Sequence, residues 1–338
     1  MKNSTILIVV AVCLIVAGIA VAGAAFTMTD FSFDGFSTEE FEEVTYTARG
    51  DFDHIMIATD IHDVTLALSD DSTCRIVGSE SRNIAIEYEI EGTMLVVRTI
   101  DERKWYDHIG IFYGGAEMTL YLPKDTYISL TVAANTGDVL VPECFTFTGA
   151  AIAIDTGDIE VRAKVTGELG LAAGTGSITV SGVEPTKLDV SVTTGRTMLE
   201  NIKTDGAITL ECSTGRTELH SIEAGAIRSN GDTGSLLLKN VYVEREIGIE
   251  RGTGDVTLTS VIAGEFDIET STGDVELNLS DAESIEIETD TGRVDAVLLS
   301  EKFFQCESST GSVKIPDTRS GGICKVTTTT GNIHITID

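Results

Sequence analysis

The sequence has few basic residues and few prolines, and each shortage argues against a class of protein. Lysine and arginine number 23 against 54 acidic residues, which gives a net charge of −31. A chain this acidic repels phosphate backbones and anionic lipid head groups, so nucleic acids are not expected partners. Only 4 prolines accompany 33 glycines, a balance that favours tight turns between strands over Pro-rich linkers or collagen-like repeats.

Motifs for catalysis, redox chemistry and metal binding are also missing. The six cysteines include no C-x-x-C pair, the five histidines show no ligand spacing, and there is no G-x-S-x-G or P-loop. Polysaccharide-degrading β-helix enzymes project carboxylates from adjacent coils, which would nominate Asp138, Asp155 and Asp158. The chain has almost no long insertions that could wall a substrate cleft, so we expect no catalysis and no cofactor.

One long apolar run is present, at the N-terminus. Every residue from Ile6 to Phe26 is apolar or glycine, and no charge lies between Lys2 and Asp30. About 20 such residues cross a bilayer as a helix, so residues 1–26 are predicted to be a transmembrane signal-anchor. A signal peptide cleaved near Ala20-Val21-Ala22 is the alternative. Lys2 places the short end in the cytoplasm, and residues 27–37 form a juxtamembrane linker before an extracytoplasmic domain.

A Thr-Gly step recurs eleven times, separated by six intervals of 19 residues and four of 20. Apolar residues alternate on both sides of each step, as in Ile285 and Ile287 before it and Val294 and Ala296 after it. A period of two indicates strands, and the glycine marks a corner. A strand–corner–strand unit of constant length stacks on itself, so the fold class is all-β: a parallel β-solenoid of about 11 coils, residues 129–338.

The inward columns follow from this register. We expect Cys144, Cys212, Cys306 and Cys324 to point inward as small buried hydrophobes. Arg251 falls in a narrow inward column, where a buried guanidinium would be costly, so a bulge is expected to turn it outward.

Residues 38–128 are predicted to form an irregular β cap. Residues 55–68 copy the coil pattern, with Ile61-His62-Asp63 in place of Thr-Gly-Asp, and Ile84–Ile90 and Met94–Ile100 are predicted to pair as a hairpin. A loop follows with five residues that could bind a partner or glycan, or could instead cover the end of the solenoid: Trp105, Tyr106, His108, Phe112 and Tyr113.

These features resemble a family of bacterial membrane-anchored β-strand-repeat domains of unknown function that are labelled "putative adhesins". The N-terminal apolar segment, the linker with its phenylalanines, the strand end Leu120-Tyr121-Leu122-Pro123 and the Thr-Gly ladder carry the likeness. The resemblance implies a β-solenoid exposed at the cell envelope and supplies no catalytic residues.

One outward column, three residues before each threonine, is acidic. Glu250, Glu269, Glu288 and Glu307 are predicted to follow one another on successive coils. Like charges about 5 Å apart repel, and calcium, which prefers oxygen ligands, would relieve the repulsion as a weakly bound ion. The alternative is a solvated acidic face that keeps the rod soluble.

The sequence therefore predicts a single-pass membrane protein whose solenoid acts as a binding or structural surface module. Its expected partners are the membrane, through the N-terminal helix, and an envelope protein or glycan. An envelope-stress sensor or regulatory accessory protein is the alternative function. Ile333–Ile337, the last strand of the sequence, is expected to leave an open edge that permits end-to-end self-association.

Overall fold

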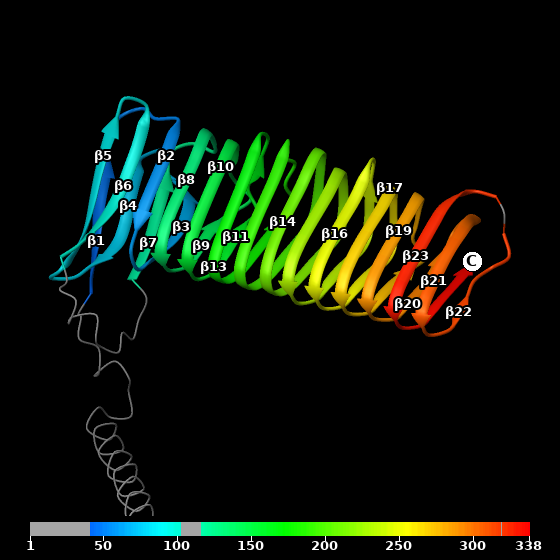
Figure 1. Ribbon diagram of the computed structural model, residues 1–338. Helices are drawn as coiled ribbons and strands as arrows, with labels where there is room; N and C mark the ends of the chain where they lie inside the picture. Colours follow the sequence, from blue (N-terminus) through cyan, green and yellow to red (C-terminus); the bar gives the residue numbers. More distant parts are fainter. Residues whose placement is uncertain (1–40, 103–115, 319) are drawn as a thin grey trace, which may run out of the picture.

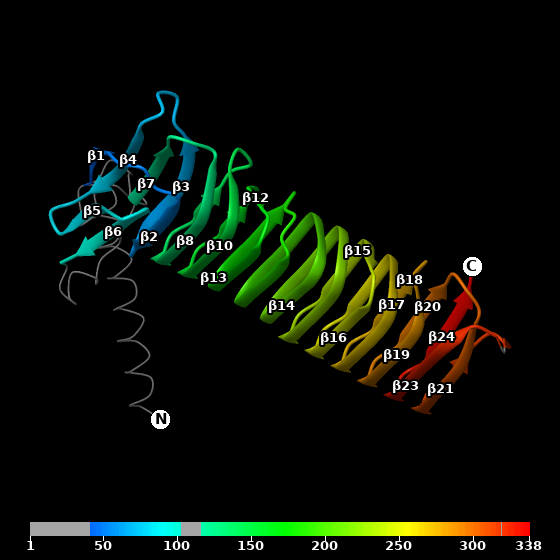
Figure 2. The same ribbon diagram turned by 90° about the horizontal axis from the view of Figure 1, so that it is seen from above.

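The computed structural model describes residues 41–102, 116–318 and 320–338 and shows an all-β rod (Figure 1). Its coils lie side by side along the rod axis, and the view from above shows the same regular stack (Figure 2). Among the described residues no helix is long and apolar enough to span a bilayer. The predicted anchor 1–26, the linker 27–37 and the loop with Trp105, Tyr106, His108, Phe112 and Tyr113 lie outside the described residues.

Each coil contributes one strand to each of two rows. In spatial order, the long row consists of β6 (Met94–Asp101), β2 (His54–Thr59), β8 (Thr126–Thr136), β10 (Thr146–Thr156), β13 (Glu168–Ser181), β14 (Lys187–Thr233), β16 (Glu246–Thr253), β17 (Val256–Thr272), β19 (Asp281–Thr291), β23 (Gly322–Thr330) and β21 (Lys302–Thr310). The short row, also in spatial order, consists of β7 (Ala116–Leu122), β3 (His62–Leu68), β9 (Val139–Val141), β11 (Ile159–Val161), part of β13, parts of β14, β15 (Leu236–Val243), part of β17, β18 (Val275–Asn278), β20 (Val294–Leu298), β24 (Ile333–Ile337) and β22 (Val313–Lys314). A two-residue strand, β12 (Lys164–Val165), lies beside β10.

Neighbouring strands in both rows are parallel and in register at the corner. Thr136 pairs with Thr156, Thr156 with Thr175, and Thr272 with Thr291. The predicted solenoid and its corner ladder are thereby confirmed. The register follows from the constant repeat length, because equivalent residues return to the same place one coil later.

The corner requires glycine for two independent reasons. Nine of the eleven corner glycines have φ between +133° and +159°, a region that residues with a side chain rarely adopt. A Cβ atom on any of the eleven would lie only 1.6–2.4 Å from a carbonyl oxygen of the neighbouring coil. In the coil that begins the ladder this oxygen belongs to His62, so Ile61-His62-Asp63 does occupy the corner position, as the sequence predicts.

The interior between the rows is filled by the predicted inward columns. Val132, Ile152 and Leu171 are buried from one row, and Ile159 and Ile178 from the other. This continuous apolar core explains why the rod is stable without a globular body, since each coil covers its neighbour.

Two predictions about inward positions were wrong. Arg251 is 4% exposed and lies in the ladder of β16 without a bulge, paired with Gly231 and Thr270. The glycine makes this possible, because a Cβ on Gly231 would lie 1.9 Å from Arg251 Nη1. Cys144 is exposed, whereas Cys212 and Cys324 are buried and Cys306 is half-buried.

At the N-terminal end, the first coil of the chain is not the outermost one. β2 pairs on one side with β8 and on the other with β6, and β3 pairs with β7, so β6 and β7 stack outside β2 and β3. Antiparallel strands β1 (Glu42–Ala48), β4 (Cys74–Glu80) and β5 (Ile84–Glu91) complete this end. The predicted hairpin is confirmed, since β5 pairs with β6 from Ile84 to Asp101.

The C-terminal end shows the same inversion of order. β23 pairs with β19 on one side and β21 on the other, and β24 lies likewise between β20 and β22. The final coil of the chain is thus inserted beneath the penultimate one (Figure 1). The prediction that Ile333–Ile337 forms the open end was wrong, because β22 lies outside β24 and pairs with Ile333 and His334, so β22 forms the end instead.

A candidate binding face along the long row

The outward side of the long row, which we call the long-strand face, carries several open hollows. Three open concavities lie on it. Those of about 540 and 500 Å³ lie side by side over the same coils and share Ala133, Ala153, Ala172 and Ser191, whereas the one of about 480 Å³ lies further towards the C-terminal end. They are lined by residues one to five positions before the corner threonines, which the alternation turns outward or places at the bend. A ligand lying along the rod would contact several coils at once.

Near the N-terminal end the long-strand face is nearly uncharged and its side chains are small. Ala133, Ala151 and Ala153 are exposed there, and Gly170 and Ala172 are half-exposed. Small side chains leave the backbone close to the surface, so this part of the face is flat and able to approach another extended surface closely.

Towards the C-terminal end the same face becomes acidic. Asn230 pairs with Glu250, Glu250 with Glu269, and Glu269 with Glu288. These residues, together with Asp232 and Asp290, line the concavity of about 480 Å³.

The predicted run of four glutamates is interrupted. Glu288 pairs with Thr327, and Thr327 with Glu307, because the final coil is inserted between them. Three glutamates are therefore consecutive, and Glu307 lies one coil further away. Among the described residues no three His, Cys, Asp or Glu side chains are grouped closely enough to hold a metal ion. Weak calcium binding by Glu250, Glu269, Glu288 and Glu307 stays a prediction.

Arg251 lies against this acidic concavity from the inside. Its Nη2 donates to Ser229 Oγ at 2.7 Å, whereas its Nε has no hydrogen-bond partner. Burial lowers the pKa of the guanidinium by disfavouring the charged form. The nearby carboxylates are on the outside of the coil, so Arg251 faces the interior and is not positioned as a surface anion site.

Ion pairs stabilise the rest of the face and the flanking corners. Arg228 Nη2 lies 2.5 Å from Glu246 Oε1, and Lys325 Nζ lies 2.5 Å from Glu286 Oε1. On the opposite side of the rod, buried Glu218 is held by Arg196 and by Arg216, whose Nε is 2.5 Å away. Burial raises the pKa of Glu218, but the hydrogen bond and charges of the two arginines outweigh it, and its pKa is lowered.

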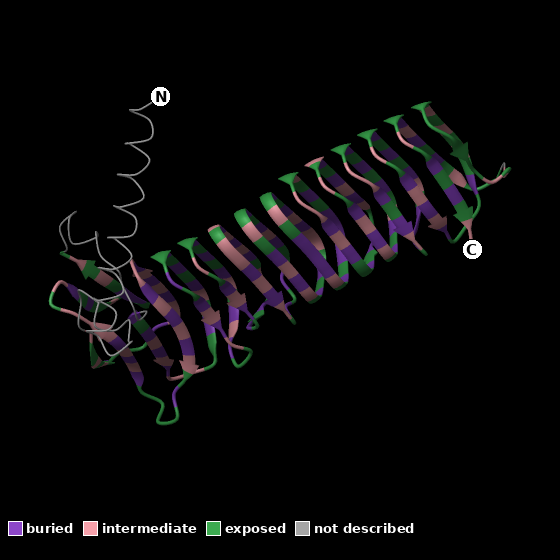
Figure 3. Ribbon diagram, turned by 90° about the horizontal axis from the view of Figure 1, so that it is seen from below, coloured by how far each residue is buried: buried purple, intermediate pink, exposed green. Residues whose placement is uncertain are grey.

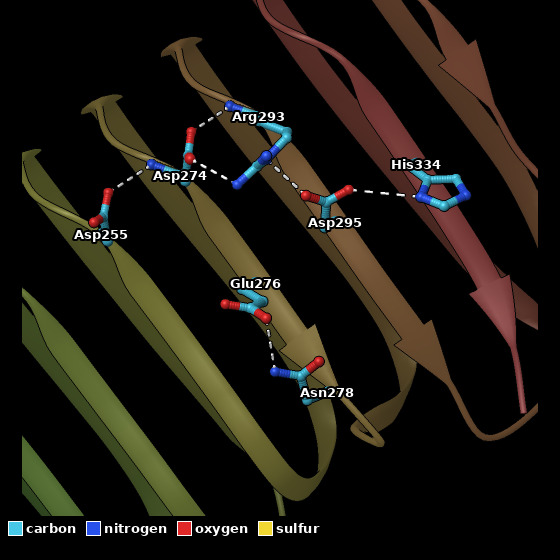
Figure 4. A network of polar contacts seen from close by, with 7 residues as sticks. All are labelled: Asp255, Asp274, Glu276, Asn278, Arg293, Asp295 and His334. Atoms are coloured by element: carbon cyan, nitrogen blue, oxygen red, sulfur yellow. Dashed lines mark hydrogen bonds and ion pairs between the residues drawn. The ribbon is translucent and has the colours of Figure 1, made fainter.

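The aspartates that follow four of the corner glycines have a role that the sequence analysis did not identify. Asp138, Asp158, Asp255 and Asp274 each accept a backbone N–H of the next coil through Oδ1, at distances of 2.6–3.0 Å. Figure 4 shows the part of this ladder from Asp255 to Arg293. Asp138 and Asp158, nominated from sequence as catalytic carboxylates, are therefore structural acceptors, while Asp155 is exposed on the long-strand face. The period of 19–20 residues with Asp at this position was the available signal.

Comparison with solved structures gives distant likenesses. A "putative adhesin" from Parabacteroides distasonis shares 12% identity over 74% of this chain and 98% of its own, with a TM-score of 0.44. A "putative lipid binding protein" from the same species shares 15% identity over 72% and 96%, with a TM-score of 0.41. A "putative adhesin" from Bacteroides fragilis shares 11% identity over 88% and 97%, with a TM-score of 0.38. No curated protein matches the sequence.

A family model matches the sequence itself. The model described as Toastrack DUF4097 matches residues 52–232 and 216–338, which together include both ends of the corner ladder. The chain belongs to the Toastrack DUF4097 family.

Proposed function

We propose that the chain is a non-catalytic surface rod, anchored to the cell membrane by its N-terminal segment, that binds envelope or extracellular ligands along the long-strand face. The observation that carries the proposal is that three open concavities share one face of the stack. A repeated surface of this kind suits an extended ligand such as a glycan or a polypeptide segment, because equivalent contacts recur at every coil.

The chemistry of the face also supports binding over catalysis. The carboxylates that line the face, such as Glu250, Glu269 and Glu288, are exposed, and among the described residues none of these three is hydrogen-bonded to a nucleophile with an orienting base. Catalysis would need a walled cleft, whereas these concavities are open.

The experiment first tests on which side of the membrane the solenoid lies and then measures ligand binding. Protease added to intact cells should degrade the solenoid if it is extracytoplasmic. Glycan arrays and adhesion assays with the full chain should then show binding that Ala153→Arg abolishes, because the large side chain fills the flat part of the face. Thr257→Arg, on the opposite row, is the matched control. Binding that survives Ala153→Arg and similar changes along the face would contradict the proposal, and so would a protected solenoid.

A further inference from the structure

The two ends of the rod are built differently. The N-terminal end is closed by antiparallel strands, with Tyr46 packed against Tyr88 at 5.7 Å between ring centroids and Tyr88 Oη donating to the Thr47 carbonyl. At the C-terminal end, β21 pairs only with β23, and β22 only with β24, within the described chain. The outer edges of β21 and β22 therefore present backbone N–H and C=O groups without ladder partners.

The core is also uncovered at this end. In the outermost coil Val313 and Ile315 are 38% and 39% exposed, although they occupy inward columns. Ile333 and Ile335, the equivalent residues one coil below, are 0% and 3% exposed. Figure 3 shows the exposed colouring of the outermost strand at the C-terminal end. Of the thirteen large hydrophobic residues that are exposed in the described part of the chain, five fall within residues 299–323, namely Leu299, Phe303, Val313, Ile315 and Ile323.

The outermost coil is nevertheless firmly held. Lys302 Nζ lies 2.6 Å from Asp281 Oδ1 in an ion pair whose side chains are only 5% and 11% exposed, and Lys302 also donates to Ser300 Oγ. The open end is therefore a defined surface with a fixed register.

The segment that forms this end carries no net charge. Residues 299–323 contain three acidic residues (Glu301, Glu307, Asp317) and three basic ones (Lys302, Lys314, Arg319), a net charge of 0 in a chain of net −31. Two acidic rods repel one another along their sides, but they can approach through a neutral end.

We propose that the open C-terminal end is the interface of an end-to-end dimer, in which the outermost coils of two copies pair edge to edge. A single extended peptide could pair with β21 but would leave Val313 and Ile315 uncovered. A second solenoid end has the same cross-section and covers both strand edges and the inward residues together. At the N-terminal end the outer strands β1 and β5 are antiparallel to their neighbours and do not repeat the two-row parallel edge of β21 and β22. The contact therefore joins C-terminal end to C-terminal end and stops at two copies, with no filament.

The experiment uses the full chain in nanodiscs, examined by sedimentation and electron microscopy. The native chain is expected to form pairs of rods joined in line, with a disc at each far end. Gln305→Lys/Ser309→Lys should convert these to single rods, because it places two positive charges per copy on exposed sites of the edge strand without touching the core. Thr209→Lys/Ser213→Lys makes the same change in the same columns in the middle of the rod and should leave the dimer intact.

Three results would overturn the proposal: single rods from the native chain at every concentration, dimers joined along their sides or through the discs, or in-line dimers that persist in Gln305→Lys/Ser309→Lys. Circular dichroism of each variant checks that the coil is retained. If the edge variant unfolds locally, Val313→Thr/Ile315→Thr, which keeps the strand residues β-branched but removes apolar surface, should weaken the dimer at least 10-fold. Both variants place two lysines on the long-strand face, so loss of the dimer in the edge variant alone reports on the C-terminal end and not on that face.

Discussion

At the scale of single residues, the corner glycines impose the strictest requirement on the sequence. Gly234 has φ +139°, and a Cβ there would lie 1.6 Å from the Gly215 carbonyl oxygen. Gly234→Ala is expected to reduce the free energy of unfolding by at least about 2 kcal/mol, since both the backbone conformation and the spacing between coils must change. Urea unfolding measures this. Gly170→Ala is the control, because no atom lies within 4 Å of its Cβ position, and an equal loss there would contradict the explanation.

His62 is the residue that gives the rod a specific pH dependence. It is fully buried, Nε2 lies 2.7 Å from the Ser79 carbonyl, and Nδ1 lies 3.1 Å from Thr59 Oγ1. Burial lowers its pKa below 6.5, and this effect outweighs the Ser79 hydrogen bond and the nearby carboxylates, which raise it. The unfolded chain therefore binds a proton near pH 6.5 that the folded chain binds only at lower pH.

The contribution of His62 to the free energy of unfolding is fully present above pH 6.5. It falls as the pH decreases, by at most about 1.4 kcal/mol per pH unit. The urea midpoint of the native chain should fall more steeply between pH 7.5 and 5.5 than that of His62→Asn. His334→Asn, at an exposed position, controls for the loss of a histidine elsewhere. Equal slopes for the native and His62→Asn chains would show that His62 is not the responsible group.

At the scale of strands and coils, the order of the last two coils can be tested by disulfide formation. Glu288 pairs with Thr327, and Thr327 with Glu307. Neighbouring parallel strands lie about 4.8 Å apart, within the reach of a disulfide, whereas strands two layers apart lie about 10 Å apart, beyond it. In a chain with Cys144 replaced by Ser, Glu288→Cys/Thr327→Cys should oxidise readily and Glu288→Cys/Glu307→Cys should not. The reverse outcome would mean that the coils stack in chain order.

Much of the arrangement of strands and coils could be predicted from the sequence, and the exceptions have physical causes. The alternation of Ile285 and Ile287 and the repeated Thr-Gly step predict the coil, because they set which residues face inward and where the chain bends. The order of the last coils could not be predicted, since 19- and 20-residue spacings fit either order. The break in the glutamate column at Thr327 follows from that order. The prediction that Arg251 turns outward was wrong because its side chain occupies space that Gly231 leaves free in the neighbouring coil. This contact depends on which coils are neighbours, so it cannot be recognised within one repeat.

At the scale of the whole molecule, stability should depend on complete coils. Deleting residues 254–272 joins Thr253 to Gly273 and removes one 19-residue repeat. The remaining coils keep their register, so the chain should fold with a rod about 5 Å shorter by small-angle scattering. Deleting residues 254–263 removes only half a coil and would place corner residues against strand residues, which should unfold the C-terminal half. Similar behaviour of the two deletions would contradict the one-coil periodicity.

The burial of both terminal coils beneath a neighbour has a mechanical consequence. Repeat stacks usually come apart by peeling from an end, one interface at a time. Here a tension applied to Asp338 meets a coil held by ladders on both sides, β19 with β20 below and β21 with β22 above. The strands of this final coil must slide past the strands on both sides before the coil is released. A load carried along the rod is therefore resisted in shear already at the coil to which it is applied.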